Sequence, residues 1–394
     1  MQTRAASRDK LLIVLLHAVF FVSGIATVLI GQVLPYVSAR FHLDDLQLGY
    51  LFPAQFAGSL TGTLMTNWLG RQGRLIPATA AGGLLMAVGI AMLNLGSYEL
   101  ALAAFLVNGL GIGLTLPAIN VLILERDPAR SGSALNFLNF FWGLGAIVSK
   151  PLTDFTAQGS SLFITTLCLS IPLVLLSLAI IILPTPSEAR IQPKSRTSEA
   201  LPPIWSNPLA WAIALFGFIH VGFESGIGGW LTTYTERVEG PAETRLITPT
   251  FLFFLFFIIG RGIAPAFFRY LDENKVIFIS LLVILSGLAL ILTASGSFQL
   301  GIGGALCGLG TSSVFPTNIS RFSKAFGSEA MRRATPLFLC GTLGATAVTW
   351  LIGFISQRFG DLRSGMYVLA LSIMLLIVLQ MVLAFHLKSP KKGV

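Results

Sequence analysis

Long apolar segments separated by short polar loops run through nearly all of the chain. A bilayer core about 30 Å thick requires about 20 apolar residues per helix, and this criterion predicts twelve spanning helices. The predicted spans cover residues 11–37, 48–69, 75–97, 98–124, 132–155, 161–184, 208–235, 248–268, 276–296, 298–319, 334–357 and 365–387. The pattern therefore predicts an all-α membrane protein with twelve transmembrane helices.

One long polar segment divides the predicted spans into two sets of six. It runs from Thr185 to Asn207 and contains four prolines, a composition that cannot bury a core of its own. We therefore expect an N-terminal six-helix bundle at 1–184, a cytoplasmic linker at 185–207 and a C-terminal six-helix bundle at 208–394.

Short motifs recur in the two halves at a nearly constant offset. Gly-Leu-Gly at 109–111 recurs at 308–310, and Leu-Gly-Ala at 144–146 recurs at 343–345, both 199 residues further on. Phe-x-Ser-Gly-Ile at 21–25 recurs at 223–227, an offset of 202. Several repeats at one offset indicate a duplication, and secondary transporters are built in this way, with the substrate site near the midplane between the halves. We therefore expect two pseudo-symmetric bundles.

Composition and charge exclude a water-soluble protein. Hydrophobic residues make up 54% of the chain and charged residues 11%, whereas soluble domains carry about 25% charged residues. The net charge of +9 comes with no basic run that would indicate nucleic-acid binding. Of the Lys and Arg residues outside the predicted spans, nineteen lie on the side of the N-terminus and five on the other. The positive-inside rule then predicts a multi-pass protein of the cytoplasmic (inner) membrane with both termini in the cytoplasm.

The loop between the second and third predicted spans resembles the signature of the major facilitator superfamily. That signature is roughly Gly-x-Leu-x-Asp-Arg-x-Gly-Arg, and residues 68–74 keep its Arg-x-Gly-Arg end, with Gly70 at the acidic position. The resemblance covers nearly the whole chain. It implies the major facilitator fold and transport by alternating access.

Within that superfamily the chain resembles the fucose/galactose/glucose–proton symporter group of sugar permeases. The segments that resemble this group are residues 111–113, 118–120, 134–139, 223–234 and 259–261. The resemblance implies a monosaccharide as substrate. Fucose symporters carry one acid in the first span and one in the fourth, whereas this chain has no acid in its first span and Leu116 at the fourth-span position. The usual pair for proton coupling is therefore absent.

Glu224 is the carboxylate that the hydropathy pattern places deep inside a span. His220 precedes it by four residues and shares its helix face, and Arg261 lies eight residues, or about 12 Å, before the span-ending Arg269. Intramembrane acids usually work in transport, so we expect Glu224, His220 and Arg261 to serve in proton coupling or gating. The alternative is that Glu224 has only a structural role and binds Arg261 or a backbone group of a neighbouring helix. Lys150, near the outer end of its span, is expected to snorkel to the headgroups.

Amide and aromatic side chains suggest where a neutral polyhydroxy solute binds. Amides supply both hydrogen-bond donors and acceptors, and aromatic rings offer a flat apolar face to sugar C–H groups. The expected substrate-binding residues are Asn120, Asn136, Asn139, Trp142, Trp230 and Tyr234. The alternative for the asparagines is hydrogen bonding between helices.

Several other functions lack their sequence signals. The nucleotide-binding pattern GxxxxGK[ST] is absent, and the three cysteines and four histidines are scattered, which argues against an enzyme, a catalytic residue, a cofactor or a metal site. The expected partners are a sugar-like small molecule, protons if transport is coupled, and the lipid bilayer, but no nucleic acid. We expect a monomer. The alternative function is a multidrug or amphiphile exporter of the same fold.

Overall fold

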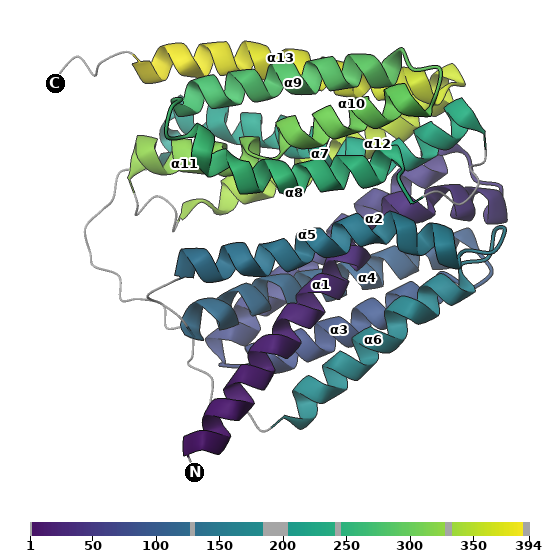
Figure 1. The fold of residues 1–394 in the computed structure, drawn as a ribbon, viewed down its shortest axis with the longest axis vertical. Helices are drawn as coiled ribbons and strands as arrows, with labels where there is room; N and C mark the ends of the chain where they lie inside the picture. The colour runs from purple at the N-terminus through teal and green to yellow at the C-terminus, as the bar shows by residue number, and fades with distance from the viewer. Residues whose placement is uncertain (1, 127–130, 184–203, 241–245, 328–332, 389–394) are drawn as a thin grey trace. The chain divides into compact units, whose positions relative to one another are not determined.

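The computed structural model describes residues 2–126, 131–183, 204–240, 246–327 and 333–388, and these residues contain helices but no strand (Figure 1). Contacts divide the chain into two compact units, one formed by residues 1–43 and 50–198 and the other by residues 44–49 and 199–394. Of the expected linker, residues 185–203 lie outside the described part, and Ile204–Ser206 form the short 3₁₀ helix η2.

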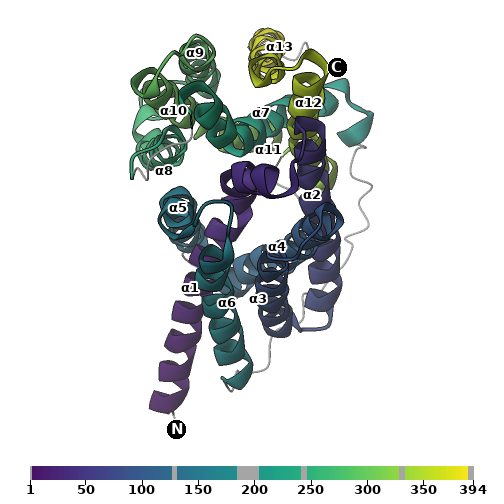
Figure 2. The ribbon, with the colours of Figure 1, turned by 90° about the vertical axis from the view of Figure 1, so that its right-hand side faces the viewer.

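The helices follow the predicted spans closely (Figure 2). Those before the linker are α1 (Gln2–Phe41), α2 (Asp45–Arg71), α3 (Leu75–Met92), α4 (Tyr98–Arg126), α5 (Ser131–Thr156) and α6 (Phe163–Ile182). Those after it are α7 (Pro208–Glu239), α8 (Pro249–Phe267), α9 (Glu273–Leu292), α10 (Ser297–Thr311), α11 (Val314–Phe326), α12 (Thr335–Phe359) and α13 (Leu362–Lys388). Within the described residues, ten segments are long and apolar enough to cross a membrane. Helices α2 and α5 have the length, but they are more polar.

The tenth predicted span is interrupted, because α10 ends at Thr311 and α11 begins at Val314. Proline has no N–H, and its ring clashes with the carbonyl four residues before it. Pro316 therefore cannot bond the carbonyl of Ser312, which places the interruption at Ser312 and Ser313. Both residues keep right-handed helical dihedral angles, so the span is distorted locally and continues in the same direction.

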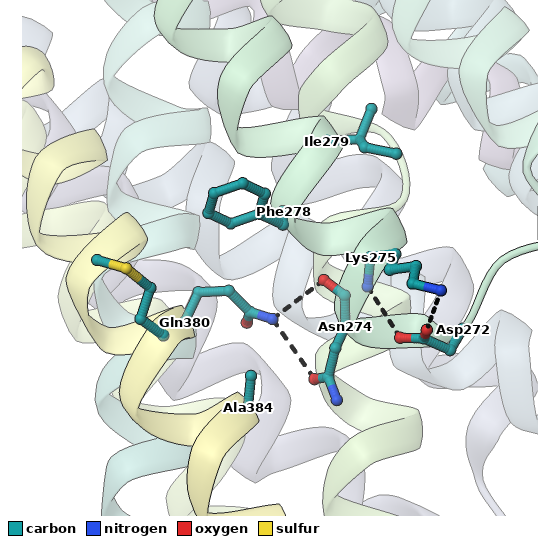
Figure 3. Close-up of a pocket in the computed structure, with 8 residues that line it drawn as sticks. Asp272, Asn274, Lys275, Phe278, Ile279, Gln380 and Ala384 are labelled. Atoms are coloured by element: carbon teal, nitrogen blue, oxygen red, sulfur yellow. Dashed lines mark hydrogen bonds and ion pairs between the residues drawn. The ribbon is translucent and has the colours of Figure 1, made fainter. Parts of the chain in front are cut away.

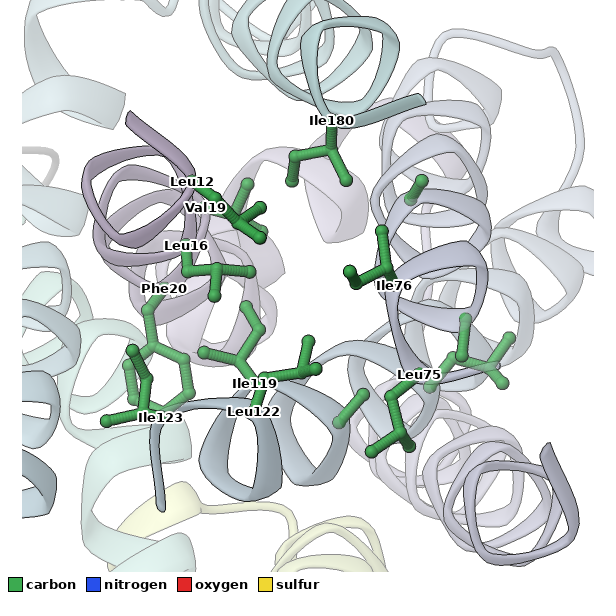
Figure 4. Close-up of a cluster of buried hydrophobic side chains, with 14 of the residues drawn as sticks. Leu12, Leu16, Val19, Phe20, Leu75, Ile76, Ile119, Leu122, Ile123 and Ile180 are labelled. Atoms are coloured by element: carbon green, nitrogen blue, oxygen red, sulfur yellow. The ribbon is translucent and has the colours of Figure 1, made fainter. Parts of the chain in front are cut away.

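The core of the first unit is apolar, and its side chains come from five helices, α1, α3, α4, α5 and α6 (Figure 4). Leu16 of α1, Ile76 of α3, Ile119 of α4 and Ile180 of α6 are all at most 5% exposed. Because both lipid and this core are apolar, hydrophobic burial alone does not hold the helices together in a membrane, and close packing must do so. Small residues at the helix crossings are therefore expected to be decisive.

The repeated glycines stand at equivalent helix crossings in the two units. A Cβ on Gly109 of α4 would lie 2.0 Å from the Gln55 carbonyl oxygen of α2, and one on Gly308 of α10 would lie 2.0 Å from that of Phe253 in α8. The glycines of the Leu-Gly-Ala repeat make the same kind of contact. Gly145 of α5 faces a backbone carbonyl of α1, and Gly344 of α12 faces one of α7, at 2.1 and 1.9 Å. The motif repeats thus mark the same contacts twice, and the predicted pseudo-symmetric fold is confirmed.

Gly344→Ala is expected to destabilise the protein by about 1–3 kcal/mol, because the added methyl would force apart two closely packed backbones. Gly262 of α8 is a matched control, since a Cβ there meets nothing within 4 Å. Gly262→Ala should be neutral or slightly stabilising because alanine favours the helix. Thermal unfolding of both variants in detergent tests this, and equal midpoints would contradict the close approach at Gly344.

Candidate functional site

Three polar side chains lie close together inside the second unit. His220 and Glu224 are one turn apart on α7, and Arg261 lies on α8. Arg261 is near enough to act electrostatically on both His220 and Glu224. Its guanidinium also lies 4.2 Å from the centre of the Phe257 ring, in a cation–π contact. The three side chains expected from the sequence to work together are therefore neighbours.

These three side chains have hydrogen-bonding capacity that the described residues leave unused. The Nε of Arg261 is buried without a partner, and the buried His220 ring lies near the Thr311 backbone without a hydrogen bond of normal geometry. Glu224 is half-buried and, among the described residues, its interaction with Arg261 is electrostatic and not a direct ion pair. Buried polar groups are normally satisfied, so unpaired groups gathered at one place indicate a site that binds something polar.

The interruption between α10 and α11 lies beside this group. His220 faces the backbone of Thr311, the last residue of α10, whose own hydroxyl is buried without a partner. Gly260, next to Arg261, lets α8 approach, since a Cβ there would lie 2.2 Å from the Ser312 hydroxyl. Interrupted helices at polar sites are characteristic of transporters.

The interruption between α10 and α11 was not predicted from the sequence. The signal was present as three successive hydroxyl residues, Thr311 to Ser313, shortly before Pro316 inside an apolar span. Average hydropathy over a span is little affected by three such residues, so it predicts one continuous helix.

In the first unit, α5 presents amides and rings on an open face. Asn136, Asn139, Phe137 and Phe140 are all exposed, the two rings by 57% and 46%. The Asn139 amide donates to the Leu135 carbonyl at 2.8 Å, so its own carbonyl oxygen is available to a ligand. This face combines hydrogen-bonding groups with flat apolar ones.

Asn120 of α4 is half-buried, and its amide likewise donates to the backbone one turn earlier, to Leu116 at 2.8 Å. Trp142 is half-buried on α5, where its backbone carbonyl lies against Gly24 of α1. Both side chains are thus partly exposed, and Trp142 also packs against the apolar core of the unit.

Trp230 and Tyr234 differ from the other expected substrate-binding residues. They are 0% and 2% exposed. The Trp230 indole donates to the Thr349 carbonyl at 3.0 Å, and the Tyr234 hydroxyl donates to the Ile291 carbonyl at 3.3 Å. Both rings are buried where α7 packs against neighbouring helices. The structure therefore does not place them where they would contact a solute, contrary to the expectation from the sequence.

Lys150 is not a snorkelling side chain, contrary to the expectation from its position. It forms an ion pair with Asp154 one turn later on α5, and the two side chains are 6% and 9% exposed. The Tyr36 hydroxyl of α1 donates to the same carboxylate at 3.4 Å. Each charge compensates the other away from water. Asp154 is therefore a further carboxylate shielded from water, which the sequence placed at a span end.

The remaining features are structural. His17 Nδ1 donates to the Ile13 carbonyl at 2.8 Å, and its ring packs against Phe137 and Phe141, so His17 is a packing histidine. No group of three or more metal-binding side chains occurs within the residues that the structure describes.

Comparisons with known proteins agree on the family. The model of the Major Facilitator Superfamily matches residues 16–335. A glucose/galactose transporter of Brucella abortus biovar 1 (strain 9-941) is 24% identical over 366 residues, which cover 88% of this chain and 87% of that protein. Among solved structures, the nucleoside transporter NupG is similar with a TM-score of 0.75 at 16% identity, covering 96% of this chain and 100% of NupG. A variant of the E. coli fucose:proton symporter FucP has a TM-score of 0.62 at 19% identity, and the match covers 95% of this chain and 98% of FucP.

Proposed function

Because the chain belongs to the Major Facilitator Superfamily and is a multi-pass membrane transporter, we propose that it carries a monosaccharide by alternating access. The proposed location is the cytoplasmic membrane, with both termini in the cytoplasm, and the proposed working unit is a monomer. Relatives that are named glucose/galactose transporters support the choice of substrate.

The observation that carries this proposal is the unpaired polar group of Glu224, Arg261 and His220 inside the second unit. A sugar hydroxyl both donates and accepts hydrogen bonds. Arg261 can donate to it and Glu224 can accept from it, and the two opposite charges leave little net charge at the site. An anionic solute would meet Glu224 and a cationic one would meet Arg261, so a neutral polyhydroxy solute fits best.

The open face of α5 supports the same class of substrate. Asn136 and Asn139 offer amide groups beside the rings of Phe137 and Phe140. Amides can bind hydroxyls, while rings can cover C–H surfaces. Asn120 and Trp142 are proposed to assist from the same unit.

Proton coupling is proposed to run through Glu224. It is not engaged in a direct ion pair within the described residues, whereas Asp154 is held by Lys150 and Tyr36. A carboxyl group that carries a proton must be able to exist without a fixed counter-charge. Glu224 meets this condition, with His220 and Arg261 as the groups that modulate it.

Asn139→Ala is expected to weaken sugar binding by about 1–3 kcal/mol, because a sugar hydroxyl loses its partner in a partly desolvated site. Ser286→Ala is a suitable control, since Ser286 is exposed on α9 and bonds only its own helix, at the Leu282 carbonyl. Equilibrium binding of labelled sugar measures both variants. Unchanged affinity of a folded Asn139→Ala protein would assign this residue to packing.

A thermal-shift screen of the purified protein tests the substrate class. D-Glucose, D-galactose and L-fucose should raise the unfolding midpoint, because a ligand that binds only the folded state stabilises it. Lipophilic cations should not. Stabilisation by lipophilic cations alone would favour the alternative, a multidrug or amphiphile exporter, for which the exposed Phe137 and Phe140 rings would be the binding surface.

A further inference from the structure

A groove with a volume of about 260 Å³ opens between α9 and α13 of the second unit (Figure 3). The two helices pack side by side. Its lining residues are Asp272, Asn274, Lys275, Phe278, Ile279, Gln380, Met381 and Ala384. The groove lies where α9 begins and α13 approaches its end, and it contains none of the residues of the proposed transport site.

The walls of the groove carry large apolar side chains that are exposed on the second unit. Ile279 of α9 and Met381 of α13 are 47% and 53% exposed, and Phe278 is 37% exposed. Exposed apolar side chains without polar groups between them, as on these walls, are compatible with contact to acyl chains. The walls therefore suit a hydrocarbon chain.

Two opposite charges stand side by side at one end of the groove. Asp272 caps α9 by accepting the Lys275 backbone N–H at 3.0 Å, and its other carboxylate oxygen lies 3.3 Å from the Lys275 ammonium. Both side chains are more than half exposed. The backbone hydrogen bond lowers the pKa of the Asp272 carboxyl from its ordinary value, so the acid stays ionised at neutral pH. A ligand at this end of the groove is therefore next to both a carboxylate and an ammonium group.

The Gln380 side chain at the floor of the groove is occupied by hydrogen bonds within the protein. The Gln380 amide donates to the Asn274 backbone carbonyl at 3.2 Å, and its oxygen accepts from Arg321 at 2.6 Å. Arg321 is 3% exposed on α11. The charges offered to a headgroup are therefore those of Asp272 and Lys275, with the Asn274 amide N–H groups beside them as further donors.

We propose that this groove binds a phospholipid whose headgroup carries both a phosphate and a primary ammonium, as in phosphatidylethanolamine. The phosphate pairs with Lys275, the ammonium donates to Asp272, and one acyl chain follows Phe278, Ile279 and Met381. An anionic lipid without an ammonium is disfavoured because its phosphate would meet the Asp272 carboxylate next to Lys275. A choline headgroup cannot donate a hydrogen bond to that carboxylate.

Lipid retention by the purified full-length protein tests the proposal. Native mass spectrometry after equilibration with equimolar phosphatidylethanolamine, phosphatidylcholine and phosphatidylglycerol should show about tenfold preference for phosphatidylethanolamine, as one additional charge-assisted hydrogen bond would give. Equal retention of the three lipids, or a preference for phosphatidylglycerol, would overturn it.

Two variants separate the roles of the two charges. Asp272→Asn keeps a good helix cap but removes the negative charge, so the preference should change to phosphatidylglycerol. Lys275→Gln should lose the preference for either lipid. Arg71→Gln, which removes an exposed cation of the first unit, should behave as the wild type. If Asp272→Asn retains the wild-type preference while folded, the paired-charge model is wrong.

Discussion

Glu224→Gln is expected to abolish accumulation of sugar driven by an inward pH gradient while changing equilibrium sugar binding by no more than about threefold, or about 0.7 kcal/mol. Glutamine keeps the size of the side chain and one hydrogen-bond acceptor, but it cannot take up and release a proton. Uptake of labelled sugar into proteoliposomes, with and without a pH gradient, measures this directly. Glu99→Gln is the control, since Glu99 is an exposed acid at the start of α4.

Two outcomes would contradict this role of Glu224. If the glutamine variant still accumulates sugar against its gradient, Glu224 is structural and another group carries the proton. If the wild-type protein transports sugar with no dependence on the pH gradient, the protein is a facilitator, and Glu224 serves only to bind the solute.

Lys150→Met is expected to destabilise the protein by about 3–5 kcal/mol, because it leaves the buried Asp154 carboxylate without its counter-charge. The double variant Lys150→Met/Asp154→Leu should recover most of this loss, since replacing a whole buried ion pair by apolar residues is often neutral. Unfolding in detergent, followed by circular dichroism, compares the three proteins.

The double variant also decides between structure and function for this pair. We expect it to transport sugar like the wild type, because Lys150 and Asp154 neutralise each other. A stable double variant that has lost pH-driven accumulation would move the coupling site from Glu224 to Asp154. A single variant as stable as the wild type would show that Asp154 is not held by Lys150.

The architecture was predictable because it depends on properties that act over whole segments. Apolar length predicted most ends of the twelve spans within a few residues, and the largest difference is at α1, which begins at Gln2 and not at residue 11. The glycine repeats also predicted real contacts. A Cβ at Gly109 or Gly308 would lie 2.0 Å from a backbone carbonyl oxygen of the neighbouring helix, so only glycine fits there. The same residue is therefore required at the equivalent position of both halves.

Details that depend on tertiary contacts were not predictable. Whether Lys150 snorkels or pairs depends on which face of α5 meets Tyr36 of α1, and hydropathy does not contain that information. Trp230 and Tyr234 have the chemistry of sugar-binding residues, yet their rings point into the α7 packing surface. Arg321 lies two residues beyond the predicted tenth span, yet it is 3% exposed and donates to the Gln380 side chain inside the bundle.

Counterflow in proteoliposomes tests the central claim, that the protein carries a neutral monosaccharide, most directly. Vesicles loaded with unlabelled D-glucose or D-galactose and diluted into labelled sugar, without any ion gradient, should transiently accumulate the label, because a carrier exchanges solutes through the same alternating site. Vesicles of the Asn139→Ala variant should require more sugar for the same effect. Absence of counterflow with every monosaccharide, from protein that exchanges a lipophilic cation, would contradict the account.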